Sequence, residues 1–442
     1  MKKVITYGTY DLLHYGHISL LERAKSLGDY LIVGVTSDDY DKSRGKINNV
    51  QTLMERVAAI KALGIADEVI VEEYEGQKID DIRRFDVDIF TVGSDWQGKF
   101  DYLSEYCQVV YLSRTEGISS TEIRTERNKL SIGLVGEKKT ELTSLSKFLR
   151  EVKYVNGIEA VCSNNSLGDL PIEEDYESLL DKVDAVYVTS HPSKHYEQIK
   201  KALLKGKHVL CEAPIALSEK ETVELFDLAK EKNCILMAGV KTAFMTAYER
   251  MILLAKSGII GNVFSVEATC TSIKDLEQYT EEDIRDNWNS ITEWAPFALL
   301  PIFQILGTDF KTCQIATNYL NKQYKFDNFS KISFVFDKAV ASAKVAKAVK
   351  AEGELIVSGT KGYIYVPAPW WKMDYFEVRY ENPSDNRRYF YQLDGEGIRY
   401  EILAFVKTIE NNRFVAGIDE SVSVAMSKVM EMYYKDETYE IG

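Results

Sequence analysis

Apolar residues in the first 126 positions form short continuous runs, which alternate with segments where apolar residues recur every three or four positions. The runs predict buried strands, and the spaced segments predict helices that cover them. Strands are expected at residues 4–7, 30–35, 68–71, 89–92 and 108–112, with helices beginning near residue 18 and spanning residues 52–63 and 79–85. This alternation predicts a parallel sheet with helices on both faces.

The alternation restarts at residue 129 and continues to residue 238. Strands are expected at residues 129–136, 159–162, 185–189, 208–211 and 234–238, with helices at 142–151, 176–180, 196–204 and 219–232. β-rich runs then dominate residues 264–376, and helices at 398–410 and 422–433 close the chain. The expected fold class is α/β: a Rossmann-like sheet in residues 1–127, a second Rossmann-type domain in 128–250, and an α+β open-sheet domain in 251–442.

Composition and charge narrow the class of protein. With 442 residues, 45% hydrophobic and 28% charged, the chain is expected to be soluble and to contain more than one core. The net charge of −14 argues against nonspecific binding to nucleic acid or to anionic membranes, so an anionic substrate must meet a local basic patch. No signal peptide, membrane insertion or membrane span is expected. The six cysteines are scattered without a Cys-x-x-Cys pair, which favours reduced thiols in a cytoplasmic protein and no metal site.

The junction after the first expected strand carries the strongest chemical signal. It reads Gly8-Thr-Tyr-Asp-Leu-Leu-His-Tyr-Gly-His17, so a strand passes through a glycine turn to the start of a helix. Such junctions bind phosphate, because free backbone N–H groups and the helix dipole favour negative charge. His14 and His17 lie three positions apart on one side of the helix, where they can stabilise charge on a reacting phosphate. The alternative is a polar helix start whose histidines lie in solvent.

Two further segments carry positive charge. Lys42, Arg44 and Lys46 form a basic loop in an otherwise acidic chain, although a solvated charge run has the same composition. Later, the segment Arg114-Thr-Glu-Gly-Ile-Ser-Ser-Thr121 places three hydroxyl residues before an expected helix. These hydroxyls are suited to capping the helix or to binding a ligand.

Together with Gly93-Ser-Asp-Trp96, these motifs closely resemble those of glycerol-3-phosphate cytidylyltransferases, within the wider cytidylyltransferase family of nucleotidyltransferases. The resemblance covers about residues 1–126. It implies a nucleotidyltransferase that joins CTP to a small polyol phosphate, most of all sn-glycerol 3-phosphate, giving the CDP-polyol and pyrophosphate. It also implies a Mg²⁺ ion held mainly by the CTP phosphates, with no metal site built from protein ligands alone. In the family, such products are precursors of teichoic-acid-like or capsular polymers.

The resemblance assigns roles to residues of this chain. The catalytic set comprises His14, His17, Lys46 and Arg114. The nucleotide-binding set comprises Gly8, Thr9, Tyr10, Gly93, Asp95, Trp96, Arg114, Thr115, Gly117, Ile118, Ser119, Ser120 and Thr121. The acceptor-binding set comprises Asp11, Arg56 and Asp67. Ser94 stands where the family has an acid, so the pocket for base and ribose differs at that position.

The rest of the chain resembles the Gfo/Idh/MocA family of NAD(P)-dependent sugar dehydrogenases, in residues 190–195, 206–218 and 256–263. The residues that this family needs for chemistry have changed. Its glycine-rich phosphate turn reads Gly136-Glu-Lys-Lys-Thr-Glu141, where Glu137 and Glu141 repel phosphate and Lys138 blocks its close approach. Further replacements are Ser163 for the ribose-binding acid, Ala213 for the lysine of Glu-Lys-Pro, Phe297 for a histidine and Leu300 for a carboxylate. His195 matches a family histidine, but a structural role is the stronger interpretation.

We therefore expect this region to be redox-inactive, with NAD(P) not expected as a cofactor. Two alternatives remain open. The protein would be a bifunctional cytidylyltransferase and NAD(P)-dependent polyol-phosphate dehydrogenase if the region kept its chemistry. Alternatively, the C-terminal part is a dimerisation or partner-docking module, and a homo-oligomer, most simply a dimer, is expected.

Overall fold

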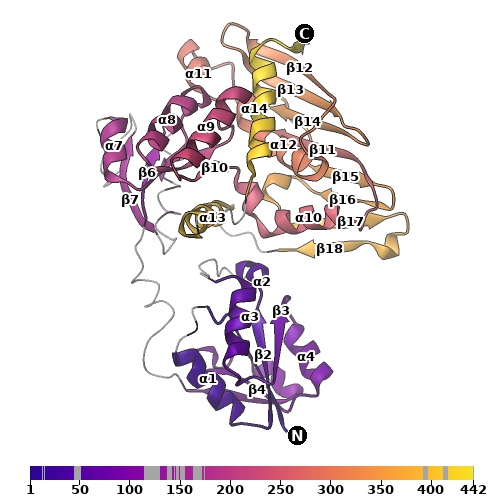
Figure 1. Ribbon diagram of the computed structural model, residues 1–442. Helices are drawn as coiled ribbons and strands as arrows, with labels where there is room; N and C mark the ends of the chain where they lie inside the picture. The colour runs from indigo at the N-terminus through magenta and orange to yellow at the C-terminus, as the bar shows by residue number, and fades with distance from the viewer. Residues whose placement is uncertain are drawn as a thin grey trace. The chain divides into compact units, whose positions relative to one another are not determined.

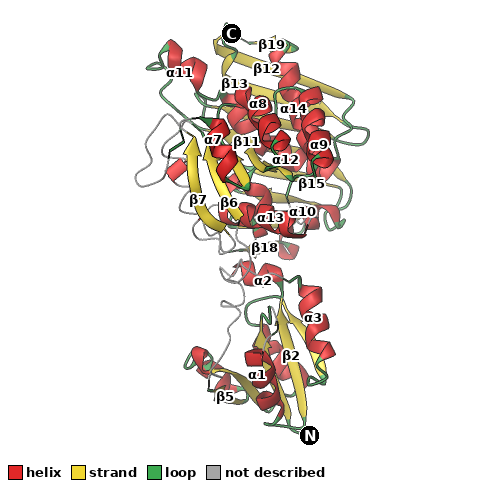
Figure 2. Ribbon diagram, turned by 60° about the vertical axis from the view of Figure 1, so that its left-hand side comes forward, coloured by secondary structure: helices red, strands yellow, loops and turns green. Residues whose placement is uncertain are grey.

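The computed structural model describes residues 1–11, 13, 15–43, 51–113, 130–136, 142, 143, 145, 149, 155–162, 172, 173, 175–391, 397–411 and 417–441. The chain divides into two compact units, Met1–Asn128 and Lys129–Gly442. Each unit is described by itself. Figures 1 and 2 show the elements of both. The further division expected at residue 250 lies within the second unit and stays a prediction.

The first unit is built on a five-stranded sheet, sheet A, with the order β3-β2-β1-β4-β5 and every pair parallel. Its strands are β1 (Lys3–Gly8), β2 (Tyr30–Thr36), β3 (Glu68–Glu72), β4 (Ile89–Gly93) and β5 (Gln108–Leu112). Its helices are α1 (Tyr15–Lys25), α2 (Asp38–Ser43), α3 (Leu53–Ala62) and α4 (Gln77–Phe85). Because all strands run in the same direction, the loops that follow them meet at one edge.

Two apolar layers cover sheet A. Leu21 of α1 and Val57 and Ile60 of α3 pack on one face, and Ile82 of α4 packs on the other. Figure 1 shows α4 on the opposite side of the strands from α1 and α3. The predicted parallel sheet with helices on both faces is therefore confirmed, and its carboxyl edge is where a ligand site is expected.

The second unit begins with another five-stranded parallel sheet, sheet B, with the order β10-β9-β8-β6-β7. Its strands are β6 (Leu130–Val135), β7 (Val155–Cys162), β8 (Ala185–Val188), β9 (His208–Glu212) and β10 (Leu236–Gly239). The helices α7 (Tyr176–Lys182), α8 (Pro192–Leu204) and α9 (Glu219–Glu231) connect them. The second Rossmann-type sheet is confirmed.

A nine-stranded mixed sheet, sheet C, completes the second unit with the order β18-β17-β16-β15-β11-β14-β13-β12-β19. Its strands are β11 (Val263–Thr271), β12 (Thr312–Asn321), β13 (Phe326–Val335), β14 (Val340–Ala346), β15 (Leu355–Gly359), β16 (Gly362–Val366), β17 (Tyr375–Tyr380), β18 (Arg387–Phe390) and β19 (Thr438–Glu440). Its helices are α10 (Thr246–Lys256), α11 (Glu281–Asp286), α12 (Ser290–Leu306), α13 (Ile398–Asn411) and α14 (Glu420–Tyr434). The expected α+β open sheet is present.

The helix α12 packs against β11, β13 and β14 and provides much of this core. This helix was not predicted from the sequence, because its 17 residues are mostly apolar and include Pro296 and Pro301. A continuous apolar segment in a β-rich region does not distinguish a buried helix from strands. The structure shows that both prolines are accommodated within the helix.

Candidate functional site

The loop after β1 makes a sharp turn at the carboxyl edge of sheet A. Tyr10 has a φ of 52°, a left-handed conformation that is uncommon for residues other than glycine. Its ring folds back over Gly8, where an added Cβ would lie 3.0 Å from Tyr10 Cζ. Glycine is therefore favoured at position 8 by this close packing, and the local strain marks a place where the chain is held in an unusual shape.

Tyr10 does not face the edge at which a nucleotide is expected. It is 3% exposed and belongs to the apolar layer under α1 and α3. Its ring meets His17 edge to face, with 5.6 Å between the ring centres. Burial raises the pKa of Tyr10, so its hydroxyl stays neutral. Tyr10 therefore packs beside His17, and the nucleotide contact expected for it stays a prediction; His14 lies outside the described residues.

Arg56 connects several loops of the site through hydrogen bonds and an ion pair. The α3 side chain is fully buried, and its Nη1 donates to Thr9 O at 2.6 Å and to Thr36 O at 2.8 Å. Its Nε donates to Gln51 O at 3.2 Å, and its Nη2 forms an ion pair with Asp38. The guanidinium therefore joins the ends of β1 and β2 to the start of α3. These protein contacts give Arg56 a positioning role, and the acceptor-binding role expected for it stays a prediction.

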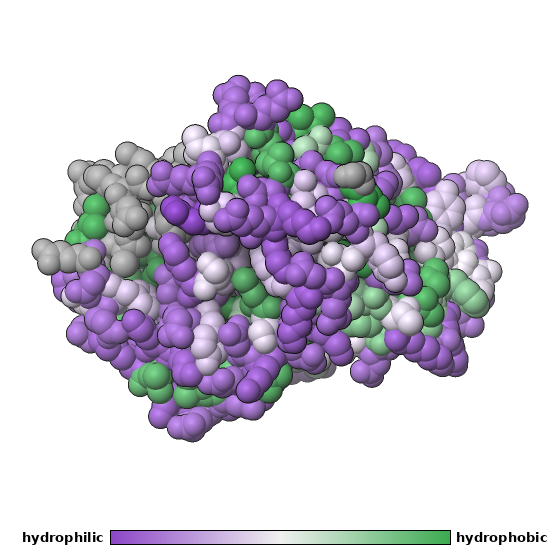
Figure 3. Space-filling view, turned by 90° about the horizontal axis from the view of Figure 1, so that it is seen from above, coloured by the Kyte–Doolittle hydropathy of each residue, from purple (hydrophilic) through white to green (hydrophobic). Residues whose placement is uncertain are grey.

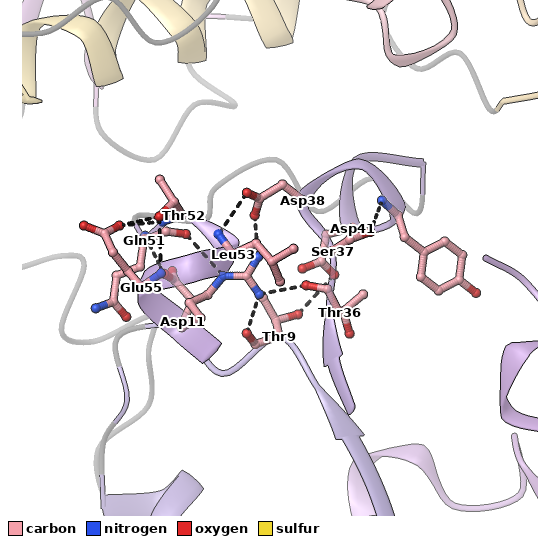
Figure 4. A network of polar contacts seen from close by, with 12 residues as sticks. Thr9, Asp11, Thr36, Ser37, Asp38, Asp41, Gln51, Thr52, Leu53 and Glu55 are labelled. Atoms are coloured by element: carbon pink, nitrogen blue, oxygen red, sulfur yellow. Dashed lines mark hydrogen bonds and ion pairs between the residues drawn. The ribbon is translucent and has the colours of Figure 1, made fainter. Parts of the chain in front are cut away.

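Three carboxylates tie the surrounding loops together, as Figure 4 shows. Asp11 accepts from the backbone N–H of Gln51 at 2.9 Å, and Asp41 accepts from Thr9 Oγ1 at 3.1 Å. Asp38 accepts from the backbone N–H of Leu53 at 3.1 Å. Asp11 is 2% exposed, so its carboxylate acts inside the loop network. Thr9 and Asp11 are thus brought together at the edge, as expected, and the network fixes their backbone.

Asp67 is not part of this group. It accepts from the backbone N–H of Leu31 at 2.6 Å and from Lys25 Nζ at 2.5 Å, both at the amino-terminal end of β2. The hydrogen bond from Leu31 lowers the pKa of Asp67, and Lys25 lowers it further. Ligands of a parallel sheet bind at the carboxyl ends of its strands, whereas Asp67 lies at the amino-terminal edge. Its acceptor-binding role stays a prediction that this position does not favour.

At the end of β4, Gly93 leads into a short 3₁₀ turn, Ser94–Trp96. Asp95 is exposed, and Trp96 packs on Phe100 with 5.8 Å between the ring centres. These residues remain at the carboxyl edge and available to a ligand. The expected site residues Lys46 and Arg114, Thr115, Gly117, Ile118, Ser119, Ser120 and Thr121 lie outside the described residues.

Two features of the carboxyl edge of sheet A were not predicted from the sequence. In the first, Arg23 of α1 donates from Nη1 to Ser113 O at 2.8 Å and so holds the chain immediately before Arg114. In the second, Glu72 at the end of β3 forms a buried ion pair with Lys78 of α4, and its other oxygen accepts from Thr36 Oγ1 at 2.9 Å. The available signal was an acid at a strand's carboxyl end, followed by a lysine in the next helix.

The second unit shows how residues at the dehydrogenase positions are used. At Gly136, an added Cβ would lie 2.3 Å from Thr189 Oγ1, so this glycine serves the packing of β6. Ala213 and Leu300 are buried apolar residues, and Phe297 packs beside Trp294 with 5.9 Å between the ring centres. The substitutions Glu137, Lys138, Glu141 and Ser163 lie outside the described residues.

His195 is fully buried, with Nδ1 2.8 Å from Pro214 O and Nε2 2.8 Å from Ser190 O. Both ring nitrogens therefore face backbone carbonyl oxygens. These contacts connect the loops that follow β8 and β9 and support a structural role for this histidine.

The parallel sheet, the glycine turn and the histidine at the start of α1 define the first unit as a nucleotidyltransferase. A sequence profile described as cytidylyltransferase-like matches residues 5–126. The chain is 51% identical over 130 residues to the glycerol-3-phosphate cytidylyltransferase of Bacillus spizizenii, which covers 29% of this chain and 100% of that protein. The enzyme of the same name from Staphylococcus aureus is 51% identical over 126 residues, 28% of this chain and 95% of that protein. The chain belongs to the cytidylyltransferase family.

For the second unit, a profile described as oxidoreductase family, NAD-binding Rossmann fold, matches residues 144–240. A 3-ketoreductase from Actinomadura kijaniata, solved with NADP and TDP-benzene, superposes with a TM-score of 0.62 at 16% identity, covering 71% of this chain and 99% of that chain. An oxidoreductase from Agrobacterium radiobacter gives a TM-score of 0.59 at 17% identity, covering 70% and 96%. At this identity, the likeness shows a shared fold alone.

Neither a membrane-spanning helix nor a metal-binding cluster of side chains is present among the described residues. No helix there is long and apolar enough to cross a membrane. Within the same residues, no group of three or more His, Cys, Asp and Glu side chains could hold a metal ion.

Proposed function

We propose that the protein transfers a cytidylyl group from CTP to sn-glycerol 3-phosphate, giving CDP-glycerol and pyrophosphate. The observation that carries this proposal is the 51% identity extending over the full length of a glycerol-3-phosphate cytidylyltransferase. The Gly8 turn and His17 at the carboxyl edge of sheet A support it, because they lie where doubly wound sheets bind nucleotides.

In the proposed reaction, an oxygen of the acceptor phosphate attacks the α-phosphorus of CTP in line, and pyrophosphate leaves without a covalent enzyme intermediate. His14 and His17 would donate to the crowded α-phosphate oxygens. A Mg²⁺ ion held mainly by the triphosphate and water would neutralise part of its charge. Positioning and charge stabilisation of this kind supply most of the catalysis in phosphoryl-type transfer.

The first unit's buried cations do not provide the remaining positive charge. Arg56 is paired with Asp38, and Lys78 is paired with Glu72. The charge of a buried cation in an ion pair is already balanced by a protein carboxylate. The proposal therefore assigns neutralisation of the triphosphate and of the departing pyrophosphate to Lys46 and Arg114.

An acceptor panel tests the proposal. The purified chain would be incubated with CTP, Mg²⁺ and each of several polyol phosphates, and pyrophosphate release would be measured. We expect the highest kcat/KM with sn-glycerol 3-phosphate. A higher value with another polyol phosphate would retain the cytidylyltransferase and replace the acceptor, whereas no release with any of them would reject the proposal.

We propose in addition that the second unit performs no redox reaction. Ala213 has no ammonium group, Phe297 has no imidazole, and Leu300 is a buried apolar side chain. At these three positions, the chain therefore cannot supply the proton donors that the resemblance implies for a polyol dehydrogenase. NADH fluorescence of the full chain tests this directly: we expect no saturable enhancement with NADH or NADPH, and a saturable signal would favour the bifunctional alternative.

A further inference from the structure

Three ionisable side chains from separate elements meet at the carboxyl edge of sheet B. The Tyr187 hydroxyl of β8 lies 2.7 Å from Glu212 Oε1, at the end of β9, and 2.5 Å from Glu401 Oε1, on α13. Tyr187 and Glu401 are both fully buried. None of the three side chains has a part in the proposed cytidylyl transfer.

If both carboxyl groups are ionised, there are too few hydrogens to form both hydrogen bonds to the Tyr187 hydroxyl. A phenol has one hydrogen to donate, and an ionised carboxylate has none. One of the two contacts would then bring two oxygens together without a hydrogen between them. A single additional proton removes the conflict: a protonated Glu401 donates to the Tyr187 oxygen, and Tyr187 donates to Glu212.

The surroundings indicate that Glu401 carries this proton. Glu401 is fully buried, and its Oε2 has no hydrogen-bond partner among the residues that the structure describes, whereas Glu212 is partly exposed. A buried charge with an unsatisfied oxygen is far more costly than a neutral acid. Burial raises the pKa of Glu401 well above its ordinary value, and the charge of Glu212 raises it further.

The other groups that face Glu401 leave this assignment in place. The hydrogen bond with Tyr187 and the charge of Lys241, which follows β10, lower the pKa of Glu401, but burial and the charge of Glu212 raise it more strongly. At Gly239, an added Cβ would lie 3.2 Å from Glu401 Oε1, so this glycine gives the acid room to approach β10. The acid therefore lies between the ends of β8, β9 and β10.

We propose that, at neutral pH, one additional proton is shared among Glu401, Tyr187 and Glu212. This proton stabilises the packing of α13 on the carboxyl edge of sheet B. When the proton is lost at alkaline pH, a buried carboxylate faces a second carboxylate, and α13 loosens. The proposal is independent of the cytidylyltransferase reaction.

Infrared spectroscopy of the full chain tests the proton itself, because a protonated carboxyl group absorbs separately from carboxylates. We expect the difference spectrum between the native protein and Glu401→Gln, at neutral pH, to contain one carboxylic-acid band. The matched control Glu381→Gln, at an exposed position, should lose no such band. A Glu401→Gln spectrum without this loss would overturn the proposal.

Tyr187→Phe provides a second, independent test, since it removes the oxygen that accepts the proton. The acid band should shift in frequency, and an unchanged band would contradict sharing through Tyr187. Hydrogen exchange of residues 398–411, corrected for base catalysis, should accelerate at alkaline pH in the native protein and stay level in Glu401→Gln. If the exchange rates of these residues depended on pH equally in the two proteins, the proton would not stabilise the packing of α13.

Discussion

At the scale of single residues, Arg56 bears most of the organisation of the first unit's site. Its buried guanidinium contacts two strand ends and one helix start, and its removal takes a donor from three carbonyl oxygens and the ion-pair partner from Asp38. We expect Arg56→Ala to lower the free energy of unfolding of this unit by at least about 2 kcal/mol, because buried carbonyl oxygens lose their donor, whereas Asp38 is 42% exposed and can be hydrated. Urea unfolding of the native protein and of the variant measures this difference in the free energy of unfolding. The exposed Arg84→Ala should change stability by less than about 0.5 kcal/mol, and an equally small effect of Arg56→Ala would refute the positioning role.

His17 provides a prediction about rate. It lies at the start of α1 with its ring supported by the edge of Tyr10. Losing one preorganised donor at a charged transition state typically costs about 10²–10³ in rate. We expect His17→Ala to lower kcat by this factor, while its circular dichroism spectrum stays native. Near-normal turnover of the folded variant would remove His17 from the catalytic set.

The position of the turn after β1 could be predicted from sequence, whereas the contacts of individual side chains could not. The Gly8–His17 motif located the turn, because a glycine between a strand and a helix has few uses. The direction of a side chain cannot be obtained from such a motif, and Tyr10 points into the core. Asp67 directly precedes β3, so the predicted strand already indicates the amino-terminal edge of the sheet, and the hydrogen bond that Asp67 accepts from Leu31 N agrees with that position.

At the scale of elements, the strands of sheets A and B were predicted well, because buried parallel strands form apolar runs flanked by polar loops. The same rule failed for α12, whose composition is mostly apolar. Tertiary packing against β11, β13 and β14 makes this segment a helix, and no local pattern records that packing. The hydrogen bonds and the ion pair of Arg56 likewise could not be predicted, since they join loops that are distant in the sequence.

The start of α12 provides a pH prediction. Asp327 of β13 is fully buried, accepts from Ile291 N at 3.0 Å and from Ser330 Oγ at 2.6 Å, and has a pKa raised to about 6 by burial. The folded state binds this proton more tightly than the unfolded state does. Its contribution to stability is therefore complete below about pH 4 and is lost as pH rises to about 6, by roughly 3 kcal/mol for about two pK units.

Thermal unfolding of the native protein and of Asp327→Asn, measured between pH 4 and 7.5, tests this assignment. We expect the difference in stability between the two proteins to change over this range and to level off above the pKa. Parallel curves would mean that Asp327 does not titrate differently in the folded and unfolded states.

At the scale of the whole molecule, the two units have separate cores and separate resemblances. The curated relatives of the first unit match it over their full length or nearly so. We therefore expect a fragment of residues 1–128 to fold and to keep CTP chemistry within about tenfold of the full chain in kcat/KM. Complete loss of activity in a folded fragment would show that the second unit contributes to catalysis.

The second unit's open sheet C is our expected site of self-association, in line with the homo-oligomer predicted from sequence. In the face seen in Figure 3, hydrophilic residues cover most of the surface and apolar residues form separate patches. Light scattering of the full chain and of residues 1–128 compares their oligomeric states. A change on truncation is expected, and identical states would place any self-association in the first unit.

The most direct test of the account is the product formed by the full chain from CTP and sn-glycerol 3-phosphate. Mass spectrometry should detect CDP-glycerol in amounts equal to the pyrophosphate released, with little product when ATP or GTP replaces CTP. His17→Ala, measured in parallel, should form the same product at a rate about 10²–10³ lower. Absence of CDP-glycerol from the active full chain, or equal product formation with ATP, would contradict the assignment.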